Sequence, residues 1–158
     1  MNVIAFDPAK KTGWAFRDPS GGLSRDIRGI WRTGVCDPKK PLAVHAIIEA
    51  AKNAGCTAAA LEDCYLSNAH GNVLTLKRLQ ESQTRIACIC ELNDLQVMMI
   101  SPSTWQADYG LRGNREDIKI GAARIARMLT GRKLDTQDEC DAVCIADYAR
   151  RLLEAERR

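Results

Sequence analysis

The chain has 158 residues, of which 46% are hydrophobic and 27% charged, with a formal net charge of +3. A chain of this length buries roughly 70% of its unfolded surface as one domain, so it needs no disulfides or structural metal to fold. Only 5% of residues are aromatic, so we expect a core of aliphatic side chains and alanine. The composition is that of a single soluble domain over residues 1–158, and the small net charge identifies no partner.

The cysteines and the apolar runs bear on where the protein works. Seven cysteines, an odd number at irregular spacing, argue against a disulfide framework, and most are expected to be buried as small hydrophobic residues. Asp7 interrupts the first apolar run, which argues against a secretory signal. Since no stretch approaches the roughly 20 apolar residues of a membrane span, we expect a cytoplasmic protein without membrane contact.

The first half of the chain predicts three strands, a helix and a further strand. The strands cover residues 2–6, 12–17 and 27–35, the first ending at Asp7 and all three forming a meander around a turn at 18–22. Pro41 is placed to open a helix that reaches about residue 53. The apolar run 57–61 is the fourth predicted strand, and Glu62 ends it.

The second half alternates helices with one more strand. A long helix is expected over 72–92, a strand over 95–100, a helix start at 101–103, a helix over 115–129 and a last helix from near Asp138 to about residue 154. The order predicts an α/β fold with a five-stranded mixed sheet and helices packed on both faces. This is the plan of the ribonuclease-H-like fold.

Four carboxylates are expected to gather at one edge of this sheet. Asp7 and Glu62 end two strands, whereas Asp138 and Asp141 stand three apart at the start of the last helix and share a face. Such a cluster is unfavourable unless cations occupy it, and oxygen ligands suit Mg²⁺ or Mn²⁺. Two such ions activate water and stabilise the leaving oxygen in phosphodiester hydrolysis. The residue types therefore suit a two-metal nuclease.

Each acid also has a purely structural explanation. Asp7 with Pro8 is a favourable turn pair, and Glu62 would be an ordinary exposed strand end. Asp135, Asp138 and Glu139 suit a helix cap and first turn. Glu139 and Asp135 also lie close enough to Asp138 to take its place in the cluster.

A basic stretch precedes the last helix. Residues 110–133 carry seven basic side chains against two acidic ones, so this stretch suits a phosphate backbone, although a solvated helix face explains it equally well.

Three segments together resemble the RuvC family of Holliday-junction resolvases. They are residues 4–15 (IAFDPAKKTGWA), 60–63 (ALED) and 138–146 (DECDAVCIA). The family pattern is an Asp-Pro-Gly turn before a Thr-Gly-aromatic strand, a strand-end Glu and a late Asp-x-x-Asp-Ala helix. The order and spacing span nearly the whole chain, and the differences suggest a divergent or phage-type member.

The resemblance implies a homodimeric, Mg²⁺- or Mn²⁺-dependent endonuclease that cuts four-way DNA junctions by paired symmetric nicks, with no small-molecule substrate. It places Asp7, Glu62, Asp138 and Asp141 on the family's metal-binding acids, and Tyr65 where relatives carry a base-contacting aromatic. It further suggests residues 72–92 as the subunit contact. In this setting the expected DNA-binding residues are Lys10, Lys11, Tyr65, Arg112, Arg115 and Lys119.

The sequence departs from the family pattern at several positions. Ala9 replaces the usual Gly after Asp-Pro, and Trp105 stands where bacterial relatives have a basic residue. Asp117 occupies the position of a second basic residue, whose phosphate-neutralising role would then fall to Arg115 or Lys119. These differences leave open two other functions: a nuclease for other branched DNA or RNA, and a junction-binding module without catalysis. A sugar-kinase-like ATPase is disfavoured because the chain lacks glycine-rich phosphate loops.

Overall fold

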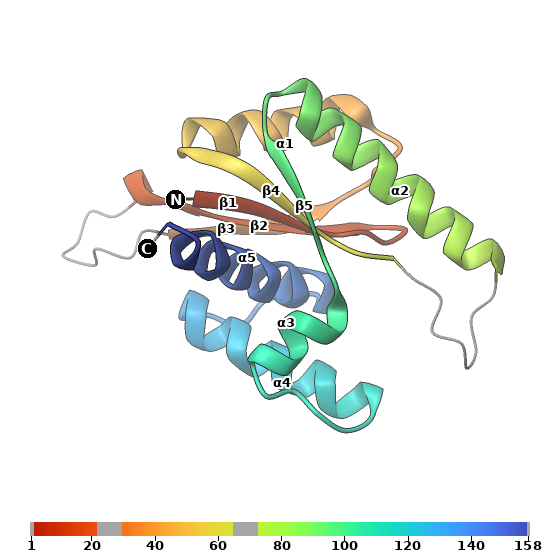
Figure 1. The fold of residues 1–158 in the computed structure, drawn as a ribbon, viewed down its shortest axis with the longest axis vertical. Helices are drawn as coiled ribbons and strands as arrows, with labels where there is room; N and C mark the ends of the chain where they lie inside the picture. The colour runs from red at the N-terminus through yellow and green to blue at the C-terminus, as the bar shows by residue number, and fades with distance from the viewer. Residues whose placement is uncertain (1, 22–29, 65–72, 158) are drawn as a thin grey trace.

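The computed structural model describes residues 2–21, 30–64 and 73–157, and its centre is a five-stranded sheet (Figure 1). The strand order is β3-β2-β1-β4-β5. β1 is antiparallel to β2 and parallel to β4, β2 is antiparallel to β3, and β4 is parallel to β5. The strands are β1 (Asn2–Asp7), β2 (Thr12–Asp18), β3 (Ile30–Cys36), β4 (Cys56–Glu62) and β5 (Gln96–Ile100).

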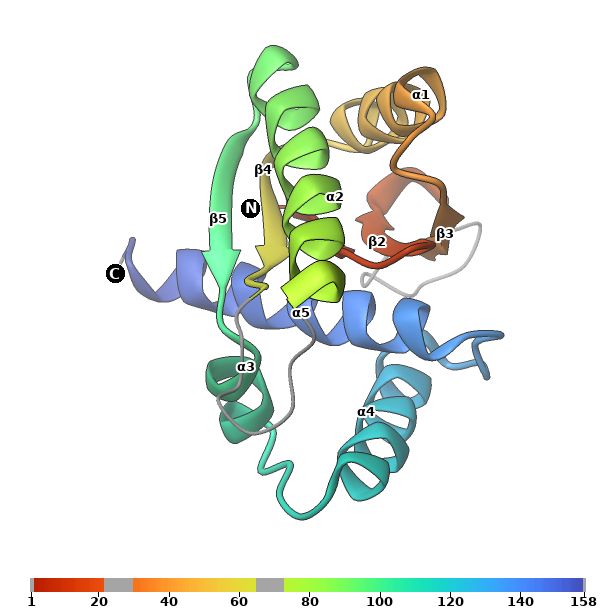
Figure 2. The same ribbon diagram turned by 90° about the vertical axis from the view of Figure 1, so that its right-hand side faces the viewer.

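Helices cover both faces of the sheet. α1 (Pro41–Asn53) and α2 (Val73–Leu92) lie on one face, and α5 (Gln137–Ala155) crosses the other, with α3 (Pro102–Asp108) and α4 (Arg115–Thr130) beside it (Figures 1 and 2). The short 3-10 helix η1 (Pro19–Gly21) follows β2. The predicted α/β fold with a mixed five-stranded sheet and helices on both faces is confirmed.

Several predicted boundaries shift by a few residues. Asp7 and Glu62 are the last residues of their strands rather than the first residues beyond them. The last helix begins at Gln137, one residue before the expected start, because Thr136 is its N-cap. The third strand was expected from residue 27; it is observed from Ile30, and residues 27–29 lie outside the described part.

Alternation along the strands separates two cores. Val3 and Ala5 of β1 face α5, whereas Ile4 and Phe6 face α1 and α2. In β4, Ala58 and Ala60 likewise belong to the α5 side, and Ala59 and Leu61 to the other. This sidedness decides which face each strand-end residue reaches.

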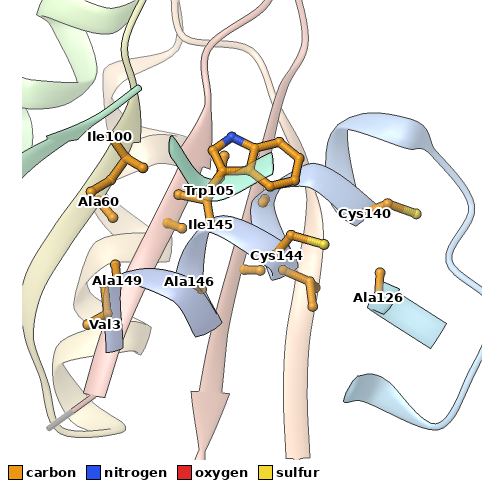
Figure 3. Close-up of a cluster of buried hydrophobic side chains, with 14 of the residues drawn as sticks. Val3, Ala60, Ile100, Trp105, Ala126, Cys140, Cys144, Ile145, Ala146 and Ala149 are labelled. Carbon is orange, nitrogen blue, oxygen red and sulfur yellow. The ribbon is translucent and has the colours of Figure 1, made fainter. Parts of the chain in front are cut away.

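Small side chains line the sheet where α5 crosses it. Ala5, Ala15 and Ala60 of the sheet and Ala142 and Ala146 of the helix are all buried in one core cluster, of which Figure 3 labels Ala60 and Ala146. Small side chains at these positions favour a close approach of the helix backbone, which is observed where Gly13 meets the Asp138 backbone. The alanine-rich core expected from the composition therefore lets α5 pack closely on the sheet.

All seven cysteines are free thiols, and five of them are buried, which confirms the prediction that most serve as small core residues. Within the described residues, no helix is long and apolar enough to cross a membrane.

Candidate metal centre

Asp7 and Glu62 are brought side by side by strand register. β1 and β4 are parallel, and their pairs run from Ala5 with Ala60 to Phe6 with Leu61, so the next pair is Asp7 with Glu62. Asp7 follows Val3 and Ala5 in the period-two alternation, and Glu62 follows Ala58 and Ala60. Both carboxylates therefore face α5.

The N-terminus of α5 lies directly over this pair. Gly13 of β2 is the register partner of Asp7, and a Cβ added to Gly13 would lie 2.1 Å from the backbone oxygen of Asp138. The absence of a side chain at Gly13 thus lets the first turn of α5 rest on the sheet beside Asp7. Asp138 and Asp141 reach the same site from that helix.

A capping box sets where α5 begins. The Thr136 hydroxyl oxygen accepts a hydrogen bond from the Glu139 backbone N–H, and the Glu139 side chain accepts one from the Thr136 N–H. The other Glu139 oxygen accepts a hydrogen bond from the Thr33 hydroxyl at 3.0 Å, which ties the helix start to β3.

The four carboxylates are electrostatically coupled. Burial raises the pKa of Asp7 well above its ordinary value, and the charges of Glu62, Asp141 and Asp138 raise it further. Burial also raises the pKa of Glu62, and the side chains of Asp7 and Glu62 hydrogen-bond to each other. The raised pKa values indicate that the described cations do not fully balance the negative charge of these carboxylates.

Asp141 and Asp138 follow the same pattern. The pKa of Asp141 is raised to about 7, mainly by burial, against a hydrogen bond from Gln137 Nε2 of 2.8 Å that lowers it. The pKa of Asp138 is raised by burial and by the neighbouring Glu139 charge, and lowered by Lys119. Lys119 is thus the cation whose charge lowers the pKa of both helix carboxylates.

Glu62 is held from both of its sides. The Trp105 indole N–H of α3 donates to Glu62 Oε1 at 2.8 Å, and Gln83 Nε2 of α2 donates to the Glu62 backbone oxygen at 2.8 Å. Neither contact adds a charge. The side chain keeps one oxygen bound to the indole and the other available to the cluster.

The donor set fits a hard divalent cation. Four carboxylates of three elements supply only oxygen ligands, and a cation would remove the repulsion that raises their pKa values. As they stand, no three His, Cys, Asp or Glu side chains of the described part are arranged to enclose an ion. Binding would therefore draw the carboxylates together from their present positions.

The two acids that competed with Asp138 lie elsewhere. Both oxygens of the buried Glu139 are used by Thr136 and Thr33, so this carboxylate serves the helix cap. Asp135 is exposed and precedes the helix. Of the three candidates, only Asp138 is among the charges that raise the pKa of Asp7.

The expected DNA-binding residues lie in different parts of the fold. Lys10 and Lys11 are exposed in the turn between Asp7 and β2. The charge of Lys119 of α4 lowers the pKa of Asp138 and Asp141, whereas Arg112 and Arg115 are exposed and have no described contact to them. Tyr65 lies outside the described residues. Asp117 accepts from the Asn114 N–H in the capping box of α4, which explains an acid at that position.

Three residues of the site were missed by the sequence reasoning. Trp105 and Gln83 hold Glu62, and Gly13 seats α5. In the sequence, Trp105 stands out only as a departure from the family pattern, and Gly13 only as part of a motif. Gln83 had no signal, because a polar residue in a helix does not reveal that its amide contacts a strand end.

The sheet order, the helices on both faces and the seating of α5 define the ribonuclease-H-like fold. Neither a protein-family model nor a curated protein matches the chain in sequence. Among solved structures, it is similar to Thermus thermophilus RuvC, alone and in complex with a Holliday junction substrate. Each comparison gives a TM-score of 0.66 and 15% identity over 96% of both chains. The resemblance to RuvC noted in the sequence is thereby confirmed at the level of the fold.

Proposed function

We propose that this protein is a Mg²⁺- or Mn²⁺-dependent endonuclease that resolves four-way DNA junctions by paired symmetric nicks. One observation carries the proposal: β1, β4 and α5 bring together a buried Asp7 and the half-buried Glu62, Asp138 and Asp141, and the charges of the last three raise the pKa of Asp7. Burying like charges is costly for stability, and such clusters occur where a site serves chemistry. The fold shared with RuvC supports the choice of junction DNA.

Asp7, Glu62, Asp138 and Asp141 would hold two ions per active site. When bound, the ions supply activation of a water molecule and stabilisation of the leaving oxygen. The chain's own contribution is to orient the ligands: Trp105 holds one oxygen of Glu62, and Gln137 holds one oxygen of Asp141. Lys119, whose charge lowers the pKa of Asp138 and Asp141, would offset the charge of the phosphate that is cut.

The DNA would be positioned by phosphate contacts. Lys10 and Lys11 project from the turn after Asp7, and Arg112, Arg115 and Lys119 belong to the segment around the start of α4. Contacts of this kind fix the placement of a duplex without reading its sequence. Base stacking on Tyr65 remains a prediction for a residue outside the described part.

Paired nicks need two active sites, so we propose a homodimer. Val73 of α2 is 56% exposed and Leu92 is 83% exposed, and this helix buries few residues against its own chain. The predicted subunit contact over 72–92 falls on this helix from Val73 onward. Sedimentation equilibrium checks the dimer, and a monomeric mass at micromolar concentration contradicts it.

The deciding experiment uses a synthetic four-way junction labelled in turn on every strand. Wild type with Mg²⁺ or Mn²⁺ is expected to cut two opposing strands at symmetric positions, and Asp7→Asn to lose cleavage while still binding the junction. Asn keeps the size of Asp but cannot carry the metal-binding charge, which is why binding of DNA should survive.

Other outcomes select the alternatives. Efficient cutting of flaps, duplex or structured RNA with no preference for the four-way junction indicates a nuclease of the same fold for another substrate. A wild type that binds junctions but is as inactive as Asp7→Asn with either metal indicates a junction-binding module and removes the enzyme proposal.

A further inference from the structure

Trp105 occupies a defined position at the edge of the carboxylate cluster. β5 runs parallel to β4, with Ile100 opposite Glu62, and the Asp63 N–H donates to the Ile100 backbone oxygen at 2.8 Å. α3 begins two residues later at Pro102, with Ser101 as its N-cap. The chain therefore turns from β5 directly into a helix whose fourth residue, Trp105, stands beside the end of β4.

The indole ring is part of the core, but its nitrogen is part of the site. Trp105 is 1% exposed, and its ring belongs with Ile145 to the apolar cluster between α5 and the sheet (Figure 3). The N–H donates to Glu62 Oε1 at 2.8 Å. A buried indole N–H requires an acceptor, and this acceptor is a carboxylate of the cluster rather than a backbone oxygen.

The ring cannot easily release this bond. Its atoms are enclosed by buried side chains, so the nitrogen has a fixed position, and the oxygen that it binds is fixed as well. Gln83 independently holds the Glu62 backbone from the opposite face of the sheet. The Glu62 carboxylate is thus oriented with one oxygen committed and the other left for the cluster.

The donor is neutral, which matters in a cluster of acids. A Lys or Arg at this place would add a positive charge beside the carboxylates. An indole N–H orients Glu62 while the cluster keeps its full negative charge. Positive charge near the cluster is then supplied by Lys119 of α4, on the side of Asp138 and Asp141.

We infer that Trp105 is a positioning residue that holds Glu62 ready for a divalent cation through its indole N–H, and this inference rests on the proposed metal-dependent function. Groups that hydrogen-bond to metal ligands typically change metal affinity by about 10- to 100-fold when removed. A role limited to core packing would leave metal affinity unchanged in any variant that keeps the ring volume and the fold.

The test is Mn²⁺ binding to the whole chain, measured by calorimetry without DNA. Trp105→Phe removes the N–H and retains an aromatic core residue, and its Mn²⁺ dissociation constant is expected to rise about tenfold or more. Trp31→Phe is the matched control, because Trp31 is a buried indole (8% exposed) of the same core on β3, with no described contact to the carboxylates. Its Mn²⁺ affinity is expected to equal that of wild type.

A second measurement does not depend on the variant's stability. In a ¹H–¹⁵N spectrum of wild type, the Trp105 indole signal is expected to move on titration with Mg²⁺, and the Trp31 signal to stay. Wild-type Mn²⁺ affinity in a folded Trp105→Phe protein, or an unmoved Trp105 signal while Mg²⁺ binds, overturns the inference alone. A wild type that binds neither ion overturns the proposed metal-dependent function itself.

Discussion

Asp7 shows what the carboxylate cluster means for a single residue. It is 9% exposed, and its pKa is raised first by burial and then by three other carboxylates. At neutral pH, either a carboxyl group of the cluster keeps its proton or the carboxylates repel one another. The cluster is thus a local source of instability, which a divalent cation would relieve.

Stability in the absence of divalent metal should therefore fall as pH rises. The pKa of Asp141 is about 7 in the folded protein against an ordinary 3.8, so between these values the folded state binds more protons than the unfolded state. The stabilisation is full below about pH 4 and is lost as pH rises through about 7. In EDTA, the Tm at pH 8 is expected to lie below that at pH 5, reflecting a loss on the order of 2 kcal/mol in the free energy of unfolding.

The control for this prediction is Asp141→Asn, which keeps an oxygen that can accept from Gln137 but cannot ionise. Its Tm is expected to change less between pH 5 and pH 8 than that of wild type. Added Mg²⁺ should raise the wild-type Tm more at pH 8 than at pH 5. A wild-type Tm that rises from pH 5 to pH 8 in EDTA would contradict the coupling of these carboxylates.

At the scale of elements, the site depends on how closely α5 approaches the sheet. The contact between Gly13 and the Asp138 backbone leaves no room for a methyl group, and the Asp138 carbonyl belongs to the helix backbone, which cannot rotate aside. The alanines of the sheet and of α5 extend the same close packing along the helix. Glycine is therefore required at position 13 because the α5 backbone comes so close to β2, and not because of its own backbone conformation.

Gly13→Ala should separate α5 from β2 and weaken the site. Because the added Cβ meets backbone, we expect a loss of about 1–3 kcal/mol in the free energy of unfolding, with weaker Mn²⁺ binding. Gly121→Ala is the control: in α4 an added Cβ would meet mainly Cδ2 of Leu111, the movable end of a side chain. Urea unfolding and calorimetry measure both effects. Equal stability of Gly13→Ala and wild type would show that α5 is not seated by this contact.

At the scale of the whole molecule, charge is distributed unevenly around a small net value of +3. Asp7 and Glu62 lie at the ends of β1 and β4, whereas the exposed cations Lys10 and Lys11 lie in the turn after Asp7, and exposed Arg115 begins α4. A phosphate backbone bound by these cations would be brought toward the carboxylates and their ions. This arrangement predicts DNA binding that is strongly salt-dependent.

Each phosphate contact should appear in the salt dependence of junction binding. In an Asp7→Asn background, which prevents cleavage, Lys10→Gln and Lys11→Gln are each expected to reduce the slope of log K against log salt by about 0.9. Lys52→Gln is the control, since Lys52 lies on α1, on the opposite side of the sheet, and pairs with Glu49 at 3.8 Å. Fluorescence anisotropy measures the slopes. Identical slopes for all three variants would remove the turn after Asp7 from the proposed DNA surface.

Local patterns in the sequence predicted most elements to within a few residues, because strand alternation, Pro41 and the turn residues act over short distances. The same patterns predicted that Asp7 and Glu62 end strands. They did not distinguish Asp138 from Glu139 and Asp135. Residues close together in sequence differ mainly in the direction of their side chains, and that direction relative to the sheet depends on how the helix is placed.

The sequence by itself determined the order of elements, the alternation that points Asp7 and Glu62 to one face, and the residue types of the proposed cation site. Only the tertiary structure decided that Glu139 caps a helix, that Gly13 admits α5, and that Trp105 binds Glu62. The contacts of Glu139 with Thr33, of Gly13 with Asp138 and of Trp105 with Glu62 join residues 43 to 125 positions apart in the chain. Their partners are selected by packing of the whole molecule, which no local pattern encodes.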